Sequence, residues 1–359
     1  MSASNDHQVL SLPPEILIDI LEYTIRTHRE SIVAVLSTCS LFNILGRGII
    51  HQNLAFTSLF QLHCFTQTLP QRIPSSTKPY FACSPRTLTL ELAGGRLWFA
   101  EQDYQVGTWD LLYKAAGNMI NQLHGNTGST TRGTQERLKL ESIRLRLNSH
   151  TGDSSGAIYK ALCGLDSQSF TWTGPDPPHH FSTAIVRHAV PPLFRALTTY
   201  TRLTHLKLTN ISFPDYHENQ RYELPTLYAL QFFYLGQSTF LRAPTIAQFI
   251  LKCLYPEFDF SNIEGGFSVE PSESTTGAED RRFPSPTSAK LSCIQEIRLV
   301  DVYEGSIWEN RLRMPHIVRA VEVLLGTNQM PLGEVKDAIS KVVRVEVQTE
   351  RIEGGDRGD

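Results

Sequence analysis

The sequence predicts an α+β protein, with a helical module at the N-terminus and a larger domain of alternating strands and helices behind it. Two observations predict this class. Within the first 55 positions, apolar residues recur at helical spacing. Beyond position 80, segments with the period of 2 that is typical of strands alternate with segments of helical spacing. The length of 359 residues is too great for one simple core, which favours a small module plus a larger domain.

Composition and charge narrow the functional classes. Hydrophobic residues make up 41% of the chain and charged residues 19%, which is typical of a folded soluble protein. The formal net charge of -3 provides no global basic field for nucleic acid or an anionic membrane. The six cysteines are scattered and form no C-x-x-C pair, which favours a reducing compartment. We expect a cytoplasmic or nuclear protein with no nucleic-acid partner and no membrane partner.

Stretches of low apolar content divide the chain into segments. We expect a disordered leader, a helical module, a strand–helix domain, two disordered inserts within that domain and a disordered tail. The leader covers residues 1–9, the helical module 10–60 and the strand–helix domain 80–349. The two inserts lie near 125–137 and at 262–290, and the tail covers 350–359.

Three short helices are predicted within the module. Pro13 marks the start of the first, because proline is tolerated only in the first turn of a helix. The second covers residues 32–39, and the third covers 41–54, where Gly46 and Gly48 weaken or break it. These helices carry more apolar residues than a private core needs, so the rest of the chain or a partner must cover the surplus.

The module resembles an F-box. The resemblance lies in the phrase L-P-P-E-I-L at positions 12–17, the pair I-L at 20–21, the phrase V-L-S-T-C at 35–39 and Phe42. It implies that the helices dock on a Skp-type adaptor, which connects to a cullin scaffold. The docking set that it implies is Leu12, Pro13, Ile16, Leu17, Ile20, Leu36, Cys39 and Phe42. The alternative is that these residues pack inside the protein.

The larger domain contains leucine-rich strand phrases. Period-2 segments lie at 87–92, 143–147, 170–172, 203–208, 227–235, 297–299 and 343–347, and helical faces lie at 109–123, 246–254 and 317–325. Their uneven spacing predicts an irregular leucine-rich-repeat-like α/β solenoid, with an ordinary α/β sheet domain as the alternative. The phrases at 233–254 and 297–313 also resemble fungal F-box proteins of the leucine-rich type.

Strand parity predicts a second candidate site. If the leucines of each strand face the core, basic residues line the opposite face of the sheet. These possible substrate-binding residues are Arg144, Arg146, Lys207 and Arg298. The hypothesis is that they read an acidic or phosphorylated segment of a target, because arginine grips a carboxylate or phosphate with two hydrogen bonds. The alternative is that these four residues are ordinary solvated strand residues, whose charges are partly neutralised by Glu91, Glu296 and Glu346.

No catalytic motif stands in the sequence. There is no nucleophile elbow, phosphate-binding loop, dinucleotide fingerprint or H-E-x-x-H helix. We interpret His179–His180 as a solvated loop and His63–Cys64 as structural residues, and we expect no catalytic residue, cofactor or metal.

The F-box resemblance therefore implies a non-catalytic, substrate-recruiting adaptor of a Skp–cullin–F-box ubiquitin ligase. The alternative is a protein-interaction scaffold outside the ligase pathway, whose helices pack internally or bind the adaptor without ubiquitination.

Overall fold

The computed structural model describes nine stretches of the chain. They are residues 12–69, 83–92, 107–124, 136–149, 153–174, 184–215, 222–255, 294–326 and 332–348. The segments predicted to be disordered lie outside the described residues, with the exception of Glu136 and Arg137, which lead directly into a strand.

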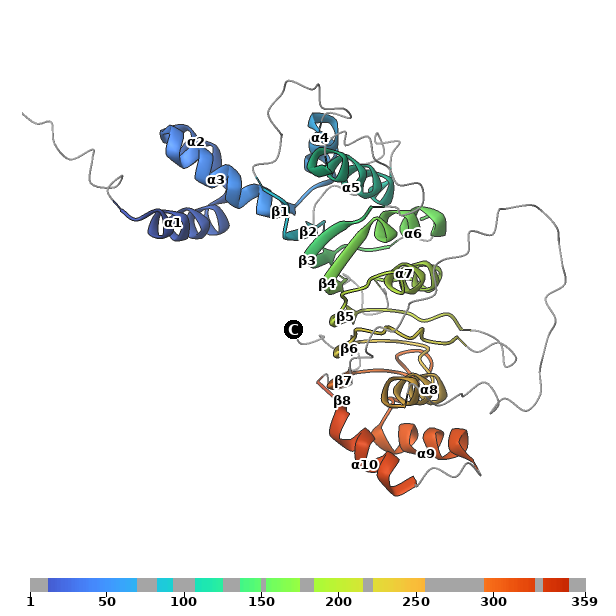
Figure 1. Ribbon diagram of the computed structural model, residues 1–359. Coiled ribbons are helices and arrows are strands. Elements are labelled where there is room, and N and C mark those ends of the chain that lie inside the picture. The colour runs from blue at the N-terminus through green and yellow to red at the C-terminus, as the bar shows by residue number, and fades with distance from the viewer. Residues whose placement is uncertain are drawn as a thin grey trace, which may run out of the picture.

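Eight parallel strands form one open sheet and follow each other across it in chain order (Figure 1). They are β1 (Asn53–Phe56), β2 (Thr87–Glu91), β3 (Leu138–Arg146), β4 (Leu165–Thr173), β5 (His205–Thr209), β6 (Phe232–Gly236), β7 (Glu296–Val300) and β8 (Val343–Glu346). Seven of them confirm the period-2 predictions, with ends that differ by up to five residues. The sequence prediction missed β1 and assigned Leu54 to the third helix.

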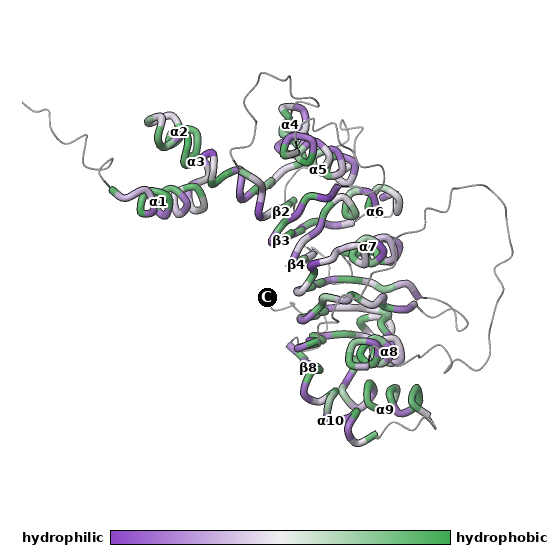
Figure 2. Tube along the Cα trace, viewed as in Figure 1, coloured by the Kyte–Doolittle hydropathy of each residue, from purple (hydrophilic) through white to green (hydrophobic). Residues whose placement is uncertain are grey.

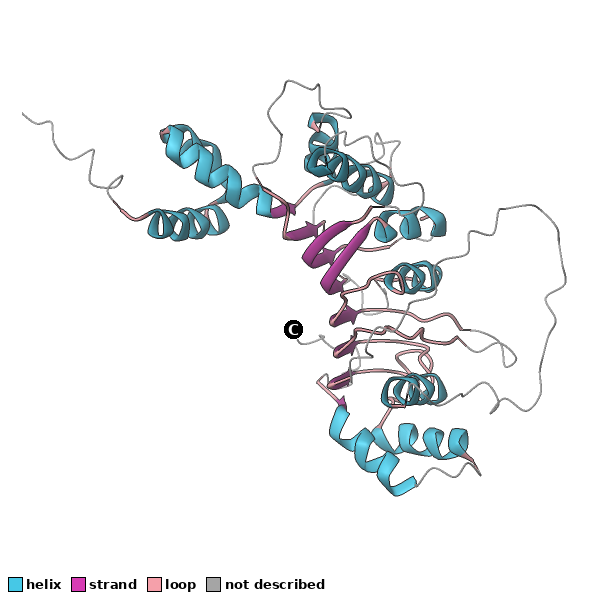
Figure 3. Ribbon diagram, viewed as in Figure 1, coloured by secondary structure: helices cyan, strands magenta, loops and turns pink. Residues whose placement is uncertain are grey.

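Helices cover one face of the sheet, and among the described residues no helix covers the other face beyond its first strands (Figure 3). This layer contains α4 (Leu59–Thr68), α5 (Thr108–His124), α6 (Ser155–Cys163), α7 (Val190–Leu197), α8 (Ala243–Leu254) and α9 (Met314–Leu325). A 3-10 turn, η5 (Arg187–Ala189), precedes α7, and α10 (Leu332–Val342) leads into β8. No helix in the described ranges is long and apolar enough to span a membrane.

The core lies between the sheet and this helix layer. Each strand turns alternate side chains inward, so buried residues form continuous rows across the strands. One row contains Leu54, Leu88, Ile143, Phe170, Leu206, Phe233, Ile297 and Val343, and all eight are buried. Trp172 on β4 is fully buried in the next row, with its ring centroid 5.2 Å from that of Trp109 on α5.

Three N-terminal helices form a separate unit, which we call the helix trio. They are α1 (Pro14–Thr27), α2 (Ile32–Thr38) and α3 (Ser40–Gln52), with the 3-10 turn η2 (Arg29–Ser31) between the first two. Helices α1 and α2 both pack against α3. Figure 1 shows the trio extending from the β1 end of the sheet, on the side away from the helix layer.

Two details of the trio differ from the prediction. Helix α3 runs unbroken through Gly46 and Gly48. A Cβ at Gly46 would collide with the side chain of Leu36, so glycine here lets Leu36 of α2 pack directly on α3. The helical module also ends earlier than the predicted residue 60, since β1 and the start of α4 belong to the sheet domain.

Candidate protein-binding surfaces

The helix trio exposes an unusual amount of apolar surface. Eight of the fifteen exposed large hydrophobic side chains of the described residues lie between positions 12 and 44. They are Leu12, Ile16, Ile18, Ile20, Tyr23, Val33, Leu41 and Ile44. Figure 2 shows the apolar stretches along α1 and α3. Exposed apolar side chains gathered on one small unit are typical of an interaction site.

Helical spacing explains which residues of α1 are exposed. Ile16, Ile20 and Tyr23 lie at i, i+4 and i+7 and form one outward stripe, with Ile16 45% and Ile20 49% exposed. Leu17 and Leu21 form the neighbouring stripe and are each only 2% exposed. The first stripe is thus available to a partner, whereas the second belongs to the core of the trio.

The predicted adaptor-binding residues consequently divide into three groups. Leu12, Pro13, Ile16 and Ile20 are exposed. Leu36, Cys39 and Phe42 are half-buried, and the Cys39 sulfur accepts a hydrogen bond from the Phe42 backbone N–H at 3.5 Å, which caps α3. Leu17 needs a correction, since its burial makes it a structural residue and removes it from the surface that a partner can contact.

The sheet face opposite the helix layer carries the predicted basic residues. The strand register places Ala55, Thr89, Arg144, Thr171, Lys207, Tyr234, Arg298 and Arg344 in one row across all eight strands. Arg146 lies two residues further along β3 than Arg144, in the next outward-facing row, beside Glu91. The register thus brings Arg144, Lys207 and Arg298 into one line.

Ion pairs distinguish these cations from one another. Arg146 pairs with Glu91 at 3.2 Å, and Arg298 grips both carboxylate oxygens of Glu346 at 3.0 and 2.7 Å. Within the described ranges no carboxylate forms an ion pair with Arg144 or Lys207. Two of the four predicted cations are therefore neutralised by neighbouring strands, and two remain available to an anionic partner.

Aromatic side chains lie among these cations, and the sequence prediction did not select them. The Lys207 ammonium lies 4.9 Å from the centroid of the Tyr234 ring, and the rings of His205 and Phe232 stack at 4.5 Å. A Cβ at Gly236 would lie 2.9 Å from the Tyr234 ring, so glycine lets this ring lie flat along β6. Strand parity alone places Phe232 and Tyr234 on this face, and it would have found them.

The Arg298–Glu346 pair leads to a prediction about pH. The two hydrogen bonds from Arg298 hold the pKa of Glu346 below its ordinary value. A carboxylate with a lowered folded-state pKa contributes stability above its unfolded pKa, and the contribution is lost as the pH falls through the folded value. We expect Arg298→Ala to raise the pKa of Glu346, as measured by NMR titration of labelled glutamate carboxyls. Arg344→Ala should raise it less, because Arg344 acts only through its charge.

A groove of about 540 Å³ lies where the helix trio meets the exposed sheet face, and we call it the corner groove. Its apolar wall includes Ile25 from α1, Ile32 from α2, and Ile49 and Ile50 from α3. Outward-facing residues of β1 to β3 form the opposite side, among them Ala55, Thr89, Ser142 and Arg144. No sequence motif marks this groove, because its two sides come from different parts of the fold.

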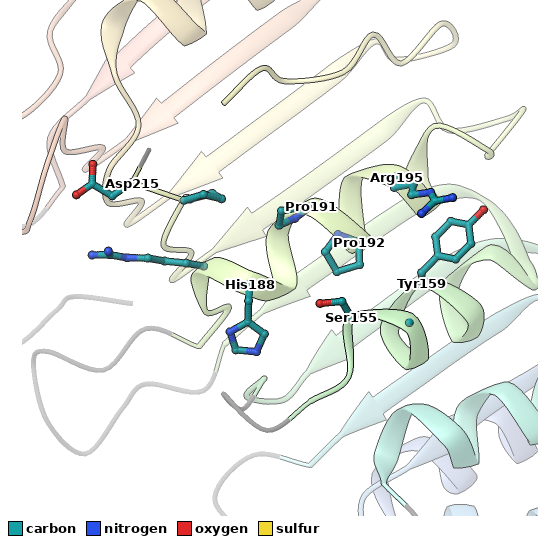
Figure 4. A pocket seen from close by; sticks show the side chains of 10 residues that line it. Ser155, Tyr159, His188, Pro191, Pro192, Arg195 and Asp215 are labelled. Atoms are coloured by element: carbon teal, nitrogen blue, oxygen red, sulfur yellow. The ribbon is translucent and has the colours of Figure 1, made fainter. Parts of the chain in front are cut away.

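A second cavity, of about 620 Å³, lies on the helix side of the molecule between α6 and α7 (Figure 4). Three prolines and Tyr159 line it together with Arg187 and Arg195. Arg195 lies 4.5 Å from the centroid of the Tyr159 ring, and Arg187 lies 3.9 Å from that of Phe240. Both guanidinium groups thus lie against aromatic rings of the protein itself. We place the candidate site on the sheet face and the trio, because neither the exposed apolar residues of the trio nor the outward row of the sheet lines this cavity. Within the described residues no cluster of three or more His, Cys, Asp or Glu side chains gathers at metal-binding distance.

Comparisons with known proteins add no further information. The chain matches no protein-family model, no curated protein and no solved structure.

Proposed function

We propose that this chain is the substrate-recruiting subunit of a Skp–cullin–F-box ubiquitin ligase. The helix trio would bind a Skp-type adaptor, and the exposed sheet face would bind the target protein. The observation that carries this proposal is the concentration of exposed apolar side chains on the trio, a unit that projects from the sheet. In such a role the protein performs no bond chemistry and raises the effective concentration of the target near the ligase.

The sheet domain supports the recruiting role. We propose that it is an irregular leucine-rich-repeat-like solenoid, in which each strand and the following chain form one repeat. Parallel strands in chain order and helices on a single face agree with this interpretation. Such a sheet presents one long uncovered face for binding. Here that face carries Arg144 and Lys207 without carboxylate partners in the described ranges, which favours a target segment with negative charge.

The adaptor contact is tested by charging the outward stripe of α1. We expect Ile16→Asp combined with Ile20→Asp to weaken binding to a purified Skp-type adaptor by about 100-fold or more, because each carboxylate would have to be desolvated in an apolar interface. Both residues are about half exposed, so the variant should remain folded. Calorimetric titration of the adaptor into the full chain measures the effect.

Val323→Asp is the matched control for this experiment. Val323 is 75% exposed on α9, at the opposite end of the sheet, so its charge should leave adaptor binding unchanged. A folded Ile16/Ile20 double variant that binds the adaptor as tightly as the parent would refute the docking surface.

The alternative function is a scaffold that binds the adaptor without promoting ubiquitination. Affinity purification with and without a proteasome inhibitor separates the two functions. A ligase subunit should capture more of its targets when degradation is blocked, and the Ile16/Ile20 double variant should show no such increase. A scaffold should capture the same amount of each partner under both conditions.

A further inference from the structure

The corner groove combines an apolar wall with a polar floor. Its isoleucines come from α1, the start of α2 and the end of α3, and Ile25, Ile32 and Ile50 are only partly buried. Beside them, Ala55 on β1 is exposed, and Thr89 on β2 and Ser142 on β3 form the polar floor. The volume of about 540 Å³ lies within the range of protein ligand pockets.

The groove is lined by two carboxylates, Glu22 and Glu91, and by one arginine, Arg144. Arg144 has no ion pair within the described ranges. Glu91 is paired with Arg146, whereas Arg86, on which the charge of Glu22 acts, already forms an ion pair with Glu141. Burial, together with the charge of Arg47, lowers the pKa of His51, so this imidazole adds no positive charge at neutral pH. A ligand with a single negative charge beside an apolar group complements this arrangement.

We propose that the corner groove binds an extended segment of the target protein, with an aliphatic side chain against the isoleucines and a carboxylate on Arg144. This inference rests on the proposed function and specifies which target segments the sheet face accepts. Because the groove opens onto the row that continues to Lys207 and Tyr234, an extended polypeptide fits it better than a compact small molecule.

The spacing between strands sets the distance between the aliphatic side chain and the carboxylate of the bound segment. Ala55 and Arg144 lie in one row on β1 and β3, separated by two strand spacings, or about 10 Å. An extended segment advances about 3.3 Å per residue, so the aliphatic and acidic residues should be two or three positions apart. A run of several acidic residues is disfavoured, because Glu22 and Glu91 also border the groove.

Selection from a phage-displayed library of random dodecapeptides on the purified full chain tests this inference. We expect enriched peptides to share an aliphatic residue two or three positions from a single Asp or Glu. Fluorescence anisotropy then measures binding of one enriched peptide, labelled with fluorescein, to variants of the chain.

Matched variants locate the binding site. Arg144→Glu should weaken peptide binding by about tenfold or more, since it replaces a charged hydrogen-bond donor with a like charge. Arg344→Glu should change it by less than about threefold, because Arg344 lies in the same row but on β8, five strands away from Arg144. Ala55→Phe should fill the apolar part of the groove and also weaken binding, and its exposed position lets the protein remain folded.

Three results would overturn the inference: no enriched peptide, enriched peptides without the aliphatic–acidic pair, or equal losses with Arg144→Glu and Arg344→Glu. Adaptor binding is measured on the same proteins, which keeps the two proposals separate. If the peptide binds but no Skp-type adaptor does, the ligase function fails and the groove site remains. If the adaptor binds and no peptide is selected, the groove assignment fails alone.

Discussion

Trp172→Ala is expected to reduce the free energy of unfolding by about 4 kcal/mol, the range found for large-to-small core substitutions. Trp172 is fully buried at the centre of the sheet and packs against Trp109 across the interface between β4 and α5. Its indole N–H also donates a hydrogen bond to the Leu147 carbonyl at 3.0 Å. The substitution therefore leaves a cavity and an unsatisfied buried carbonyl together. Urea denaturation, monitored by the circular dichroism of the backbone so that the signal does not depend on tryptophan, measures the loss of unfolding free energy.

Trp172→Phe separates the two contributions. Phenylalanine retains most of the buried apolar volume but cannot donate to Leu147, so we expect a smaller loss of about 1–2 kcal/mol. A loss below about 1 kcal/mol for Trp172→Ala would contradict the packing described for this part of the core.

Leu17→Asp is expected to unfold the helix trio locally, with a cost of about 4 kcal/mol for the lost apolar burial and the unpaired buried carboxylate. Leu17 is 2% exposed on the face of α1 turned toward the interior of the trio. The trio is small and packs mainly within itself, so the sheet domain should remain folded. Hydrogen exchange should then show lost protection over residues 14–52 and unchanged protection over β3 to β7.

Ile20→Asp is the control for Leu17→Asp. Ile20 lies three residues further along the same helix but is 49% exposed, so its substitution should cost less than about 1 kcal/mol. Equal destabilisation by the two variants would mean that the two stripes of α1 are not divided as described. The comparison also shows why Leu17→Asp cannot test adaptor binding, since it would abolish binding by unfolding the trio.

Local periodicity was sufficient to predict most of the elements. The alternation of Ile143, Leu145 and Leu147 with two arginines predicted both the strand β3 and the burial of its leucines. The i, i+3, i+4 pattern predicted α5, α8 and α9 in the same way. These patterns can be recognised because each depends on neighbours within one or two turns of chain.

The prediction failed where an element is too short to show a period. Strand β1 has only four residues, and its two buried positions, Leu54 and Phe56, follow a helix directly. Leu54 was therefore interpreted as the end of that helix. The prediction also missed four helices of eight to eleven residues, which are α4, α6, α7 and α10.

The sequence by itself determined the fold class, the apolar stripes of the trio and the outward direction of Arg144, Arg146, Lys207 and Arg298. Only the tertiary structure decided that Arg146 and Arg298 are neutralised while Arg144 is left beside a wall of isoleucines. The physical reason is that the direction of a side chain follows from the local backbone, whereas its partners depend on strand register and helix docking. Those are set by contacts between residues far apart in the chain, and no local pattern encodes them.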